Sequence, residues 1–299
     1  MDMQIESNRS IGLERRLKLG RRPKGQIIDI ALKFPLRMLA LVPFILEPAR
    51  REAASISITR MDMPLEGLPP AFDGLKIAFL TDLHSGPTTS REFLSRVVKE
   101  TNANHPDVIL LGGDYITREV GYLSEVAAVL ARLHAPLGIY GVLGNHDYWQ
   151  DPEAVHNMLQ EAGIEDISNS GRWLHCDGSR LRIAGVDDMW EGEPDLRAAL
   201  AGMKDRDIAI LLSHNPDFAV KLHDPHVKLV LSGHTHGGQI CLPGIGPLVT
   251  NSRYGRRVVS GLVPLDGFQL YTSRGLGTVL ASVRYNCPPE IAFFTLRAK

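Results

Sequence analysis

The stretch Leu231-Ser232-Gly233-His234-Thr235-His236-Gly237-Gly238-Gln239 places two histidines directly after an apolar run. The run, Val227 to Leu231, has the length and the β-branched residues of a buried strand. The glycines that follow permit a sharp turn and leave room for a ligand close to the backbone. His234 and His236, one residue apart on such a loop, can converge on a metal ion. The stretch therefore predicts a strand that ends in two candidate metal ligands.

The same pattern recurs four times upstream. Apolar runs at 75–80, 108–111, 139–143 and 208–212 have the length of strands, and polar residues follow each run. Amphipathic segments with a helical period lie between the first runs. Strands that alternate with helices predict an α/β fold with a largely parallel sheet, whose ligands gather beyond the carboxyl ends of the strands. The residues placed there are Asp82, His84, Asp114, Asn145, His214, His234 and His236.

The helix after the first of these strands has its own start signal. Thr89 is the predicted N-cap, and Glu92, three residues later, is its partner in a capping box. A later helix is predicted to begin with Asp151 as N-cap and Pro152 in the first helical position, and to end at Gly163.

The seven strand-end residues comprise two carboxylates, one amide and four imidazoles. This set exceeds the needs of one tetrahedral ion and suits two ions that share a bridging carboxylate. Oxygen ligands mixed with imidazole indicate manganese, iron or zinc rather than calcium, with manganese favoured. Paired ions activate water and hold both the attacking and the leaving oxygen of a phosphoester. His146, beside Asn145, is the predicted general acid.

Five motifs resemble, in order, the complete signature of the calcineurin-like metallophosphoesterases: Asp82-Leu83-His84, Gly113-Asp114, Gly144-Asn145-His146-Asp147, His214 and Gly233-His234-Thr235-His236. The resemblance covers roughly Leu75 to Leu296 and implies a four-layer α/β/β/α sandwich with two metal ions. It implies that Asp82, His84, Asp114 and His236 hold the first ion. It implies for the second ion Asp114, Asn145, His214 and His234, so that Asp114 bridges, and it makes His146 the proton donor.

Within that family, Gly237-Gly238-Gln239 and the segment 284–290 resemble a bacterial, membrane-associated phosphodiesterase branch. Some members of the branch are UDP-2,3-diacylglucosamine pyrophosphatases of lipid A biosynthesis. The expected reaction is therefore attack by a metal-bound hydroxide on a phosphodiester or pyrophosphate. The expected substrate is UDP-2,3-diacylglucosamine or a related nucleotide-linked or phospholipid molecule. A nuclease, a cyclic-nucleotide phosphodiesterase and a non-catalytic scaffold are the alternatives, although a net charge of −1 gives no support to nucleic acid as a partner.

The N-terminal residues are expected to lie outside the catalytic domain, which we predict at 50–299. Residues 1–25 are basic and are predicted to form a disordered tail. Residues 26–49 are predicted to form an apolar or amphipathic helix, whose uninterrupted apolar part is too short to span a bilayer. A basic flank beside an apolar segment favours the surface of an anionic membrane, so residues 26–46 predict peripheral attachment at the cytoplasmic face. A packing helix of a soluble cytoplasmic protein and an export signal are the alternatives.

Two further sets of residues have competing interpretations. Cys176, Cys241 and Cys287 are odd in number and far apart in the sequence, which predicts reduced thiols rather than a disulfide framework. Arg274 and Arg284 follow the last histidine motif, and each is a candidate either to clamp a substrate phosphate or to form a surface ion pair.

Overall fold

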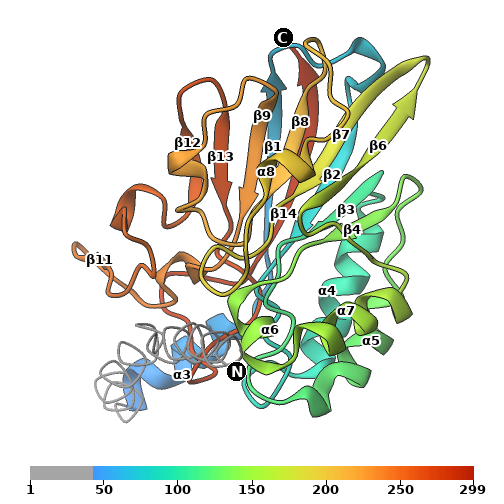
Figure 1. Ribbon diagram of the computed structural model, residues 1–299. Coiled ribbons are helices and arrows are strands. Elements are labelled where there is room, and N and C mark those ends of the chain that lie inside the picture. Colours follow the sequence, from blue (N-terminus) through green and yellow to red (C-terminus); the bar gives the residue numbers. More distant parts are fainter. Residues whose placement is uncertain (1–42) are drawn as a thin grey trace, which may run out of the picture. The chain divides into compact units, whose positions relative to one another are not determined.

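The structure, a computed structural model, describes residues 43–299 of the 299-residue chain. The predicted tail and residues 26–42 of the predicted apolar helix lie outside the described residues. Helix α3 (Pro43–Ala53) opens the described part of the chain, and residues 47–299 form one compact unit (Figure 1). None of the helices from residue 43 onward combines the length and the apolar character that a membrane crossing needs.

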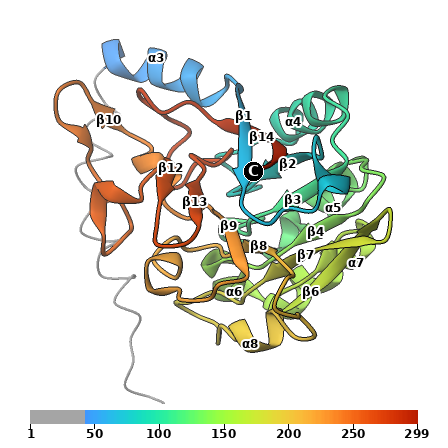
Figure 2. The ribbon, with the colours of Figure 1, turned by 90° about the horizontal axis from the view of Figure 1, so that it is seen from above.

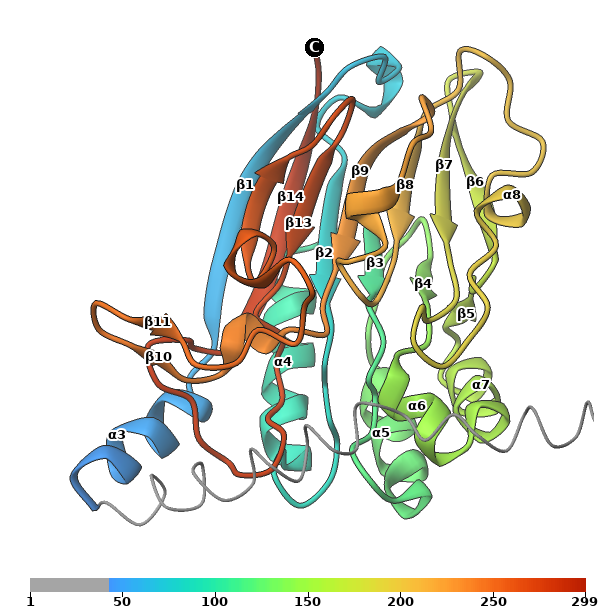
Figure 3. The same cartoon turned by 60° about the vertical axis from the view of Figure 1, so that its left-hand side comes forward.

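Two six-stranded sheets form the centre of this unit (Figure 3). The first sheet, in spatial order, consists of β1 (Ser57–Leu65), β14 (Glu290–Ala298), β2 (Lys76–Leu80), β3 (Val108–Leu111), β4 (Ile139–Gly141) and β5 (Glu165–Asp166). The second consists of β12 (Gly261–Pro264), β13 (Gln269–Thr272), β9 (Val227–Ser232), β8 (Ala209–Leu212), β7 (Ser179–Gly185) and β6 (Ser170–Cys176). A short ribbon pairs β10 (Cys241–Leu242) with β11 (Gly246–Pro247).

Both sheets are mixed, whereas the alternation of strands and helices predicts a largely parallel arrangement. In the first sheet every pair is parallel except β14 with β2. In the second sheet the outer pairs, β12 with β13 and β6 with β7, are antiparallel, and the inner pairs are parallel. The parallel inner strands are those that the alternation of strands and helices predicts. The antiparallel strands join through tight turns or come from the C-terminus, where no crossover helix marks them.

Helices cover the outer faces of the sandwich (Figure 2). The first sheet packs against α4 (Arg91–Ala103), α5 (Leu123–Leu130) and α7 (Pro152–Glu161), and the second sheet packs against the single turn α8 (Leu196–Ala199). The remaining helical turns are α6 (Asn145–Gln150), η1 (Pro70–Phe72), η2 (Val120–Tyr122), η3 (Ala219–Lys221), η4 (His236–Gly238) and η5 (Gly255–Arg257).

The alternation of side chains along the strands builds this layering. On β2, Ile77 and Phe79 pack between the two sheets, and Ala78 and Leu80 pack in the cluster with the helices. Because successive side chains of a strand point to opposite faces, one continuous apolar run can serve two cores. The result is the two-sheet α/β sandwich that the sequence predicts, with a thin fourth layer.

The helix caps agree only in part with the prediction. At α7, Asp151 accepts a hydrogen bond from the Ala154 amide (3.0 Å) as the predicted N-cap, and Gly163 adopts a φ of 72° just beyond the helix. At α4 the predicted cap is wrong by one residue, because Ser90 accepts from the Phe93 amide (3.3 Å). Thr89 is buried, and its hydroxyl instead accepts from the amide of Thr278 (3.2 Å).

Candidate metal centre

All seven predicted ligands follow the carboxyl end of a strand, at the same edge of the sandwich. Asp82 and His84 follow β2, Asp114 follows β3, and the other four follow β4, β8 and β9. Four of them form a tight cluster of buried side chains: one potential ligand atom from each of Asp82, His84, Asp114 and His236 lies within 4.8 Å of the others. Parallel strands thus bring together residues that are as much as 154 positions apart in the sequence.

Asp114 occupies the middle of the centre. Its Oδ2 atom lies 3.4 Å from His84 Nε2 and 3.3 Å from His214 Nε2. Its Oδ1 atom accepts a hydrogen bond from the amide of His146 (2.8 Å). One carboxylate oxygen therefore faces an imidazole from each of the two predicted ligand sets, which is the position that a bridging ligand needs.

The second ligand set extends the centre on the far side of Asp114. The His214 ring donates from Nδ1 to the carbonyl of Gly112 (2.7 Å), and this bond turns Nε2 towards Asp114. The rings of His214 and His234 lie with their centroids 5.1 Å apart. Asn145 is the first residue of α6 and is buried.

The donor atoms fit divalent cations. Several buried nitrogen and oxygen atoms have no hydrogen-bond partner among the described residues: His84 Nδ1, Asn145 Oδ1, His214 Nε2, His234 Nε2 and His236 Nδ1. A buried polar atom without a partner costs about 1–3 kcal/mol, so such a concentration in a native site requires an explanation. Imidazole nitrogens also converge on the carboxylates, with His84 Nε2 3.4 Å from Asp114 Oδ2 and His236 Nε2 3.4 Å from Asp82 Oδ1, and these are the ligand types of manganese, iron and zinc.

Five of the predicted ligands also have unusual backbone conformations. Positive φ angles occur at Asp82 (53°), His84 (46°), Asp114 (57°), His234 (69°) and His236 (54°). Each costs a non-glycine residue on the order of 1 kcal/mol and persists only where the surroundings impose it. One such restraint is the amide of His234, which lies 3.0 and 3.1 Å from the two carboxylate oxygens of Asp82.

Two glycines are required here for space. A Cβ atom at Gly144 would collide with the Asp114 carboxylate and lie 2.8 Å from His214 Cε1. A Cβ atom at Gly233 would collide with the side chains of Thr81 and Asp82. The glycine before each of these motifs therefore allows two ligand loops to pack directly against each other.

Most titratable groups of the centre have pKa values that favour the protonation state in which they can bind a metal ion. Burial lowers the pKa of His84 and of His234 to about 3, so both imidazoles are neutral at pH 7 and can bind a cation. Burial raises the pKa of Asp82 to about 6. Burial opposes the charge of Asp114 too, but the nearby His214 and His146 rings outweigh it and hold its pKa well below the usual range.

Asp147 is a site residue to which the sequence assigns no role. Its carboxylate is fully buried and accepts hydrogen bonds from the amides of Gly144, Asp114 and Tyr115, each at 2.9 Å. It therefore ties the loop after β4 to the loop after β3 and holds Asp114 in place. The position of Asp147 next to His146 was the sequence signal for a role in the site. Spacing along the chain does not show whether the Asp147 carboxylate points to the backbone or to a metal.

Arg274 forms an ion pair, as one of the two interpretations predicts, whereas Arg284 fits neither interpretation. Arg284 is fully buried and donates to the carbonyls of Gly277 (2.6 Å), Arg274 (2.9 Å) and Cys287 (3.1 Å). Arg274 donates to the Pro288 carbonyl (3.1 Å) and pairs with the buried Glu290 carboxylate (3.2 Å). Arg284 therefore organises the C-terminal loops from inside the protein, and the partly exposed Arg274 ties them to Glu290.

The three cysteines are free thiols, as predicted. Two of them support the loop that carries the last histidine: Cys287 donates to the His236 carbonyl (3.1 Å) and Cys241 to the Gly237 carbonyl (3.2 Å).

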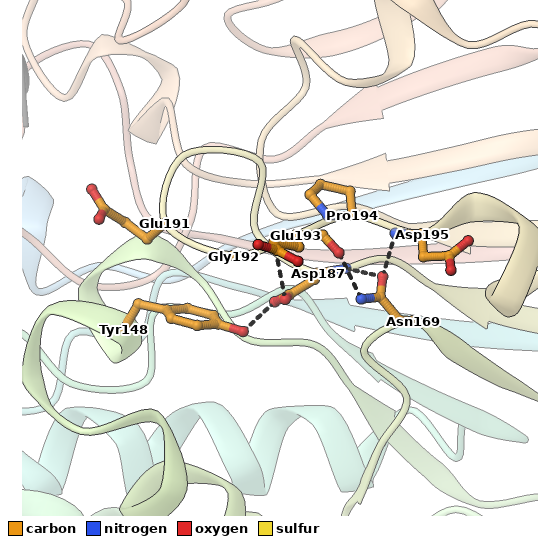
Figure 4. Close-up of a pocket in the computed structure, with 8 residues that line it drawn as sticks. All are labelled: Tyr148, Asn169, Asp187, Glu191, Gly192, Glu193, Pro194 and Asp195. Carbon is orange, nitrogen blue, oxygen red and sulfur yellow. Dashed lines mark hydrogen bonds between the residues drawn. The ribbon is translucent and has the colours of Figure 1, made fainter. Parts of the chain in front are cut away.

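A pocket of about 710 Å³ borders the loop that follows β7. Figure 4 shows the residues that line it, among them Tyr148 of α6 and the loop residues Asp187 and Glu193. The Tyr148 hydroxyl donates to Asp187, and the other Asp187 oxygen accepts from the Glu193 amide (3.0 Å). The loop is thereby joined to the helix that carries Asn145 and His146.

Comparisons with known proteins give one consistent result. Residues 75–238 match the family described as calcineurin-like phosphoesterase. The uncharacterized metallophosphoesterase YkuE of Bacillus subtilis is 38% identical over 235 residues, which cover 77% of this chain and 82% of that protein. The phosphodiesterase YaeI of Escherichia coli is 32% identical over 228 residues (74% and 82%). A zebrafish transmembrane protein with a metallophosphoesterase domain is 35% identical over 200 residues, which cover 61% of this chain and 45% of that protein.

Proposed function

The chain belongs to the calcineurin-like phosphoesterase family and is a metal-dependent phosphoester hydrolase, and we propose that it cleaves a phosphodiester or pyrophosphate with two divalent ions. The position of Asp114 is the observation that carries the proposal. One of its oxygens lies within 3.4 Å of His84 and of His214, which belong to different predicted ligand sets. A phosphodiester agrees with the name of the relative YaeI, a phosphodiesterase.

Each ion would have its own ligand set. We assign the first ion to Asp82, His84, Asp114 and His236, and the second to Asp114, Asn145, His214 and His234. The set combines oxygen ligands with imidazoles and lacks thiolates, which suits manganese, iron and zinc, and manganese is the metal that we propose to test first. When bound, the ions supply Lewis acidity that polarises a phosphoryl oxygen and lowers the pKa of a bound water.

His146 is our candidate for the proton donor to the leaving oxygen. Its Nδ1 atom lies 3.0 Å from the carbonyl of Thr117, and since a carbonyl only accepts, Nδ1 carries a hydrogen. This bond leaves Nε2 as the atom that exchanges a proton with the substrate. The ring is half-buried and stands edge-on to His84, with centroids 4.7 Å apart, so it borders the first ligand set. A positioned acid of this kind contributes about 10²- to 10⁴-fold to the rate.

The reaction class and the substrate class can be tested together. With Mn²⁺, the full chain should hydrolyse bis(p-nitrophenyl) phosphate, and a chelator should abolish the activity. We expect UDP-2,3-diacylglucosamine to be a better substrate than single-stranded DNA, because a net charge of −1 does not attract a long polyanion, and cyclic AMP is the third compound to compare. Faster cleavage of DNA would establish a nuclease, and faster cleavage of cyclic AMP a cyclic-nucleotide phosphodiesterase. If none of these four compounds is cleaved with manganese, iron or zinc, the protein is a non-catalytic scaffold.

We also propose that the protein attaches peripherally to the cytoplasmic face of a membrane through residues 26–46. The support is the basic, apolar sequence of that segment. Full-length protein should sediment with vesicles that contain phosphatidylglycerol, and Leu39→Asp with Leu41→Asp should weaken binding by at least about tenfold, because two charges enter the apolar stretch. Leu248→Asp is the matched control, since Leu248 is an exposed leucine of the catalytic part. Equal binding of all three proteins would show that the segment does not attach the chain.

A further inference from the structure

Trp190 is an exposed aromatic side chain at the metal centre. It lies between β7 and α8, and its ring stands edge-on to the His234 ring, with centroids 4.2 Å apart and planes at 87°. The residue is 38% exposed, and among the described residues it is the one aromatic member of the large, exposed apolar side chains. An indole with one edge on a candidate metal ligand and another part open to solvent can contact a molecule that binds at that metal.

The exposure of Trp190 does not come from a loose loop. The buried Asp188 carboxylate accepts hydrogen bonds through Oδ1 from the amides of Trp190 (2.8 Å) and Glu191 (2.9 Å). The Gly192 amide donates to the Asp188 carbonyl (3.0 Å), and Asp187 holds the Glu193 amide on the next turn (Figure 4). The backbone of Trp190 is therefore fixed by a carboxylate beneath it, and the indole is held at the surface.

Trp190 and His146 border different parts of the centre. The His146 ring contacts His84, a candidate ligand of the first ion, whereas Trp190 contacts His234, a candidate ligand of the second. Asp114 lies between the two sets. If the leaving oxygen faces His146, the substituent that stays on phosphorus extends towards the other set and meets the indole.

From this arrangement we propose that Trp190 is a positioning residue for the substituent that remains on phosphorus, and that it favours diesters in which this substituent carries a planar ring over diesters in which it is a small alkyl group. The inference rests on the proposed function and narrows its substrate class to aryl, nucleoside and similar ring-bearing esters. A flat apolar ring gains more from contact with an indole than a methyl group does, because it covers more apolar surface.

Two diesters with the same leaving group test this proposal. Bis(p-nitrophenyl) phosphate and methyl p-nitrophenyl phosphate both release p-nitrophenolate, so they differ only in the substituent that remains. Trp190→Ala should raise KM for the bis ester about tenfold, as expected for loss of one ring contact, and change KM for the methyl ester less than about twofold. Trp190→Phe should stay within about threefold of the wild type for both esters, because it keeps an aromatic ring.

The controls separate contact with substrate from support of the metal site. Trp173→Ala removes an indole that packs on Arg180 (4.0 Å), and it should leave both KM values unchanged. Manganese content, measured by elemental analysis, should be the same in the wild type and in Trp190→Ala. Equal losses on both esters, or a loss of manganese, would overturn the proposal in favour of a structural role under His234, and unchanged KM values would overturn it as well. A wild-type protein that hydrolyses neither ester, and also none of UDP-2,3-diacylglucosamine, single-stranded DNA and cyclic AMP, would instead refute the proposed function.

Discussion

Asp114→Asn is expected to lose both metal ions and to lower kcat/KM on bis(p-nitrophenyl) phosphate by about 1,000-fold or more. The wild-type carboxylate presents Oδ2 to His84 and His214 at 3.4 and 3.3 Å, so one atom serves both ligand sets. An asparagine keeps the size of the side chain but removes the negative charge. It also places either an amide oxygen or an NH₂ group at the bridging position, and the NH₂ group cannot bind a cation.

The measurement is the number of ions per chain, determined by elemental analysis after purification with Mn²⁺. Asp82→Asn is the informative comparison. Because Asp82 belongs only to the first predicted ligand set, this variant should lose chiefly the first ion. Asp62→Asn, at an exposed residue that pairs with Arg297, should retain both ions and full activity. Circular dichroism should confirm that each variant is folded. Two ions per chain in Asp114→Asn would show that Asp114 is not the bridge.

His146→Ala is expected to lower kcat by about 10²- to 10⁴-fold on diesters with a basic leaving group, while the metal content stays unchanged. The alanine keeps the backbone amide that donates to Asp114 Oδ1 (2.8 Å), so the ligand cage retains this support. The loss should be much smaller with p-nitrophenolate, because a stable anion leaves without a proton. This dependence on the leaving group distinguishes a lost acid from a damaged site.

The experiment is a series of diesters that differ only in the basicity of the leaving group, assayed for the wild type and His146→Ala. His156→Ala is the control, since His156 is an exposed histidine of α7 that pairs with Asp166 (3.0 Å) and is not one of the candidate ligands. A uniform loss across the series, or a loss of metal with it, would assign His146 to metal binding. Full activity of His146→Ala on every ester would show that His146 takes no part in the reaction.

Much of the fold was predictable because its signals are local. The apolar runs that become β2, β3, β8 and β9 are short and bounded by polar residues, so their type needs no distant information, and an amphipathic segment between β2 and β3 also predicts that these two pair in parallel. The antiparallel placement of β14 and β12 has no such signal. It depends on which edge or gap of a sheet remains for the last part of the chain.

The sequence by itself determined the reaction class and the seven candidate ligands, because each is a polar side chain next to a strand end, and parallel strands bring such ends to one edge. Only the tertiary structure decided how these residues meet: Asp114 between two histidines, Asp147 on three amides, Arg284 inside the protein and Trp190 exposed against His234. The reason is physical. Whether a carboxylate accepts from an amide or faces an imidazole, and whether an indole is covered, depends on neighbours that are distant in the chain and adjacent only after folding.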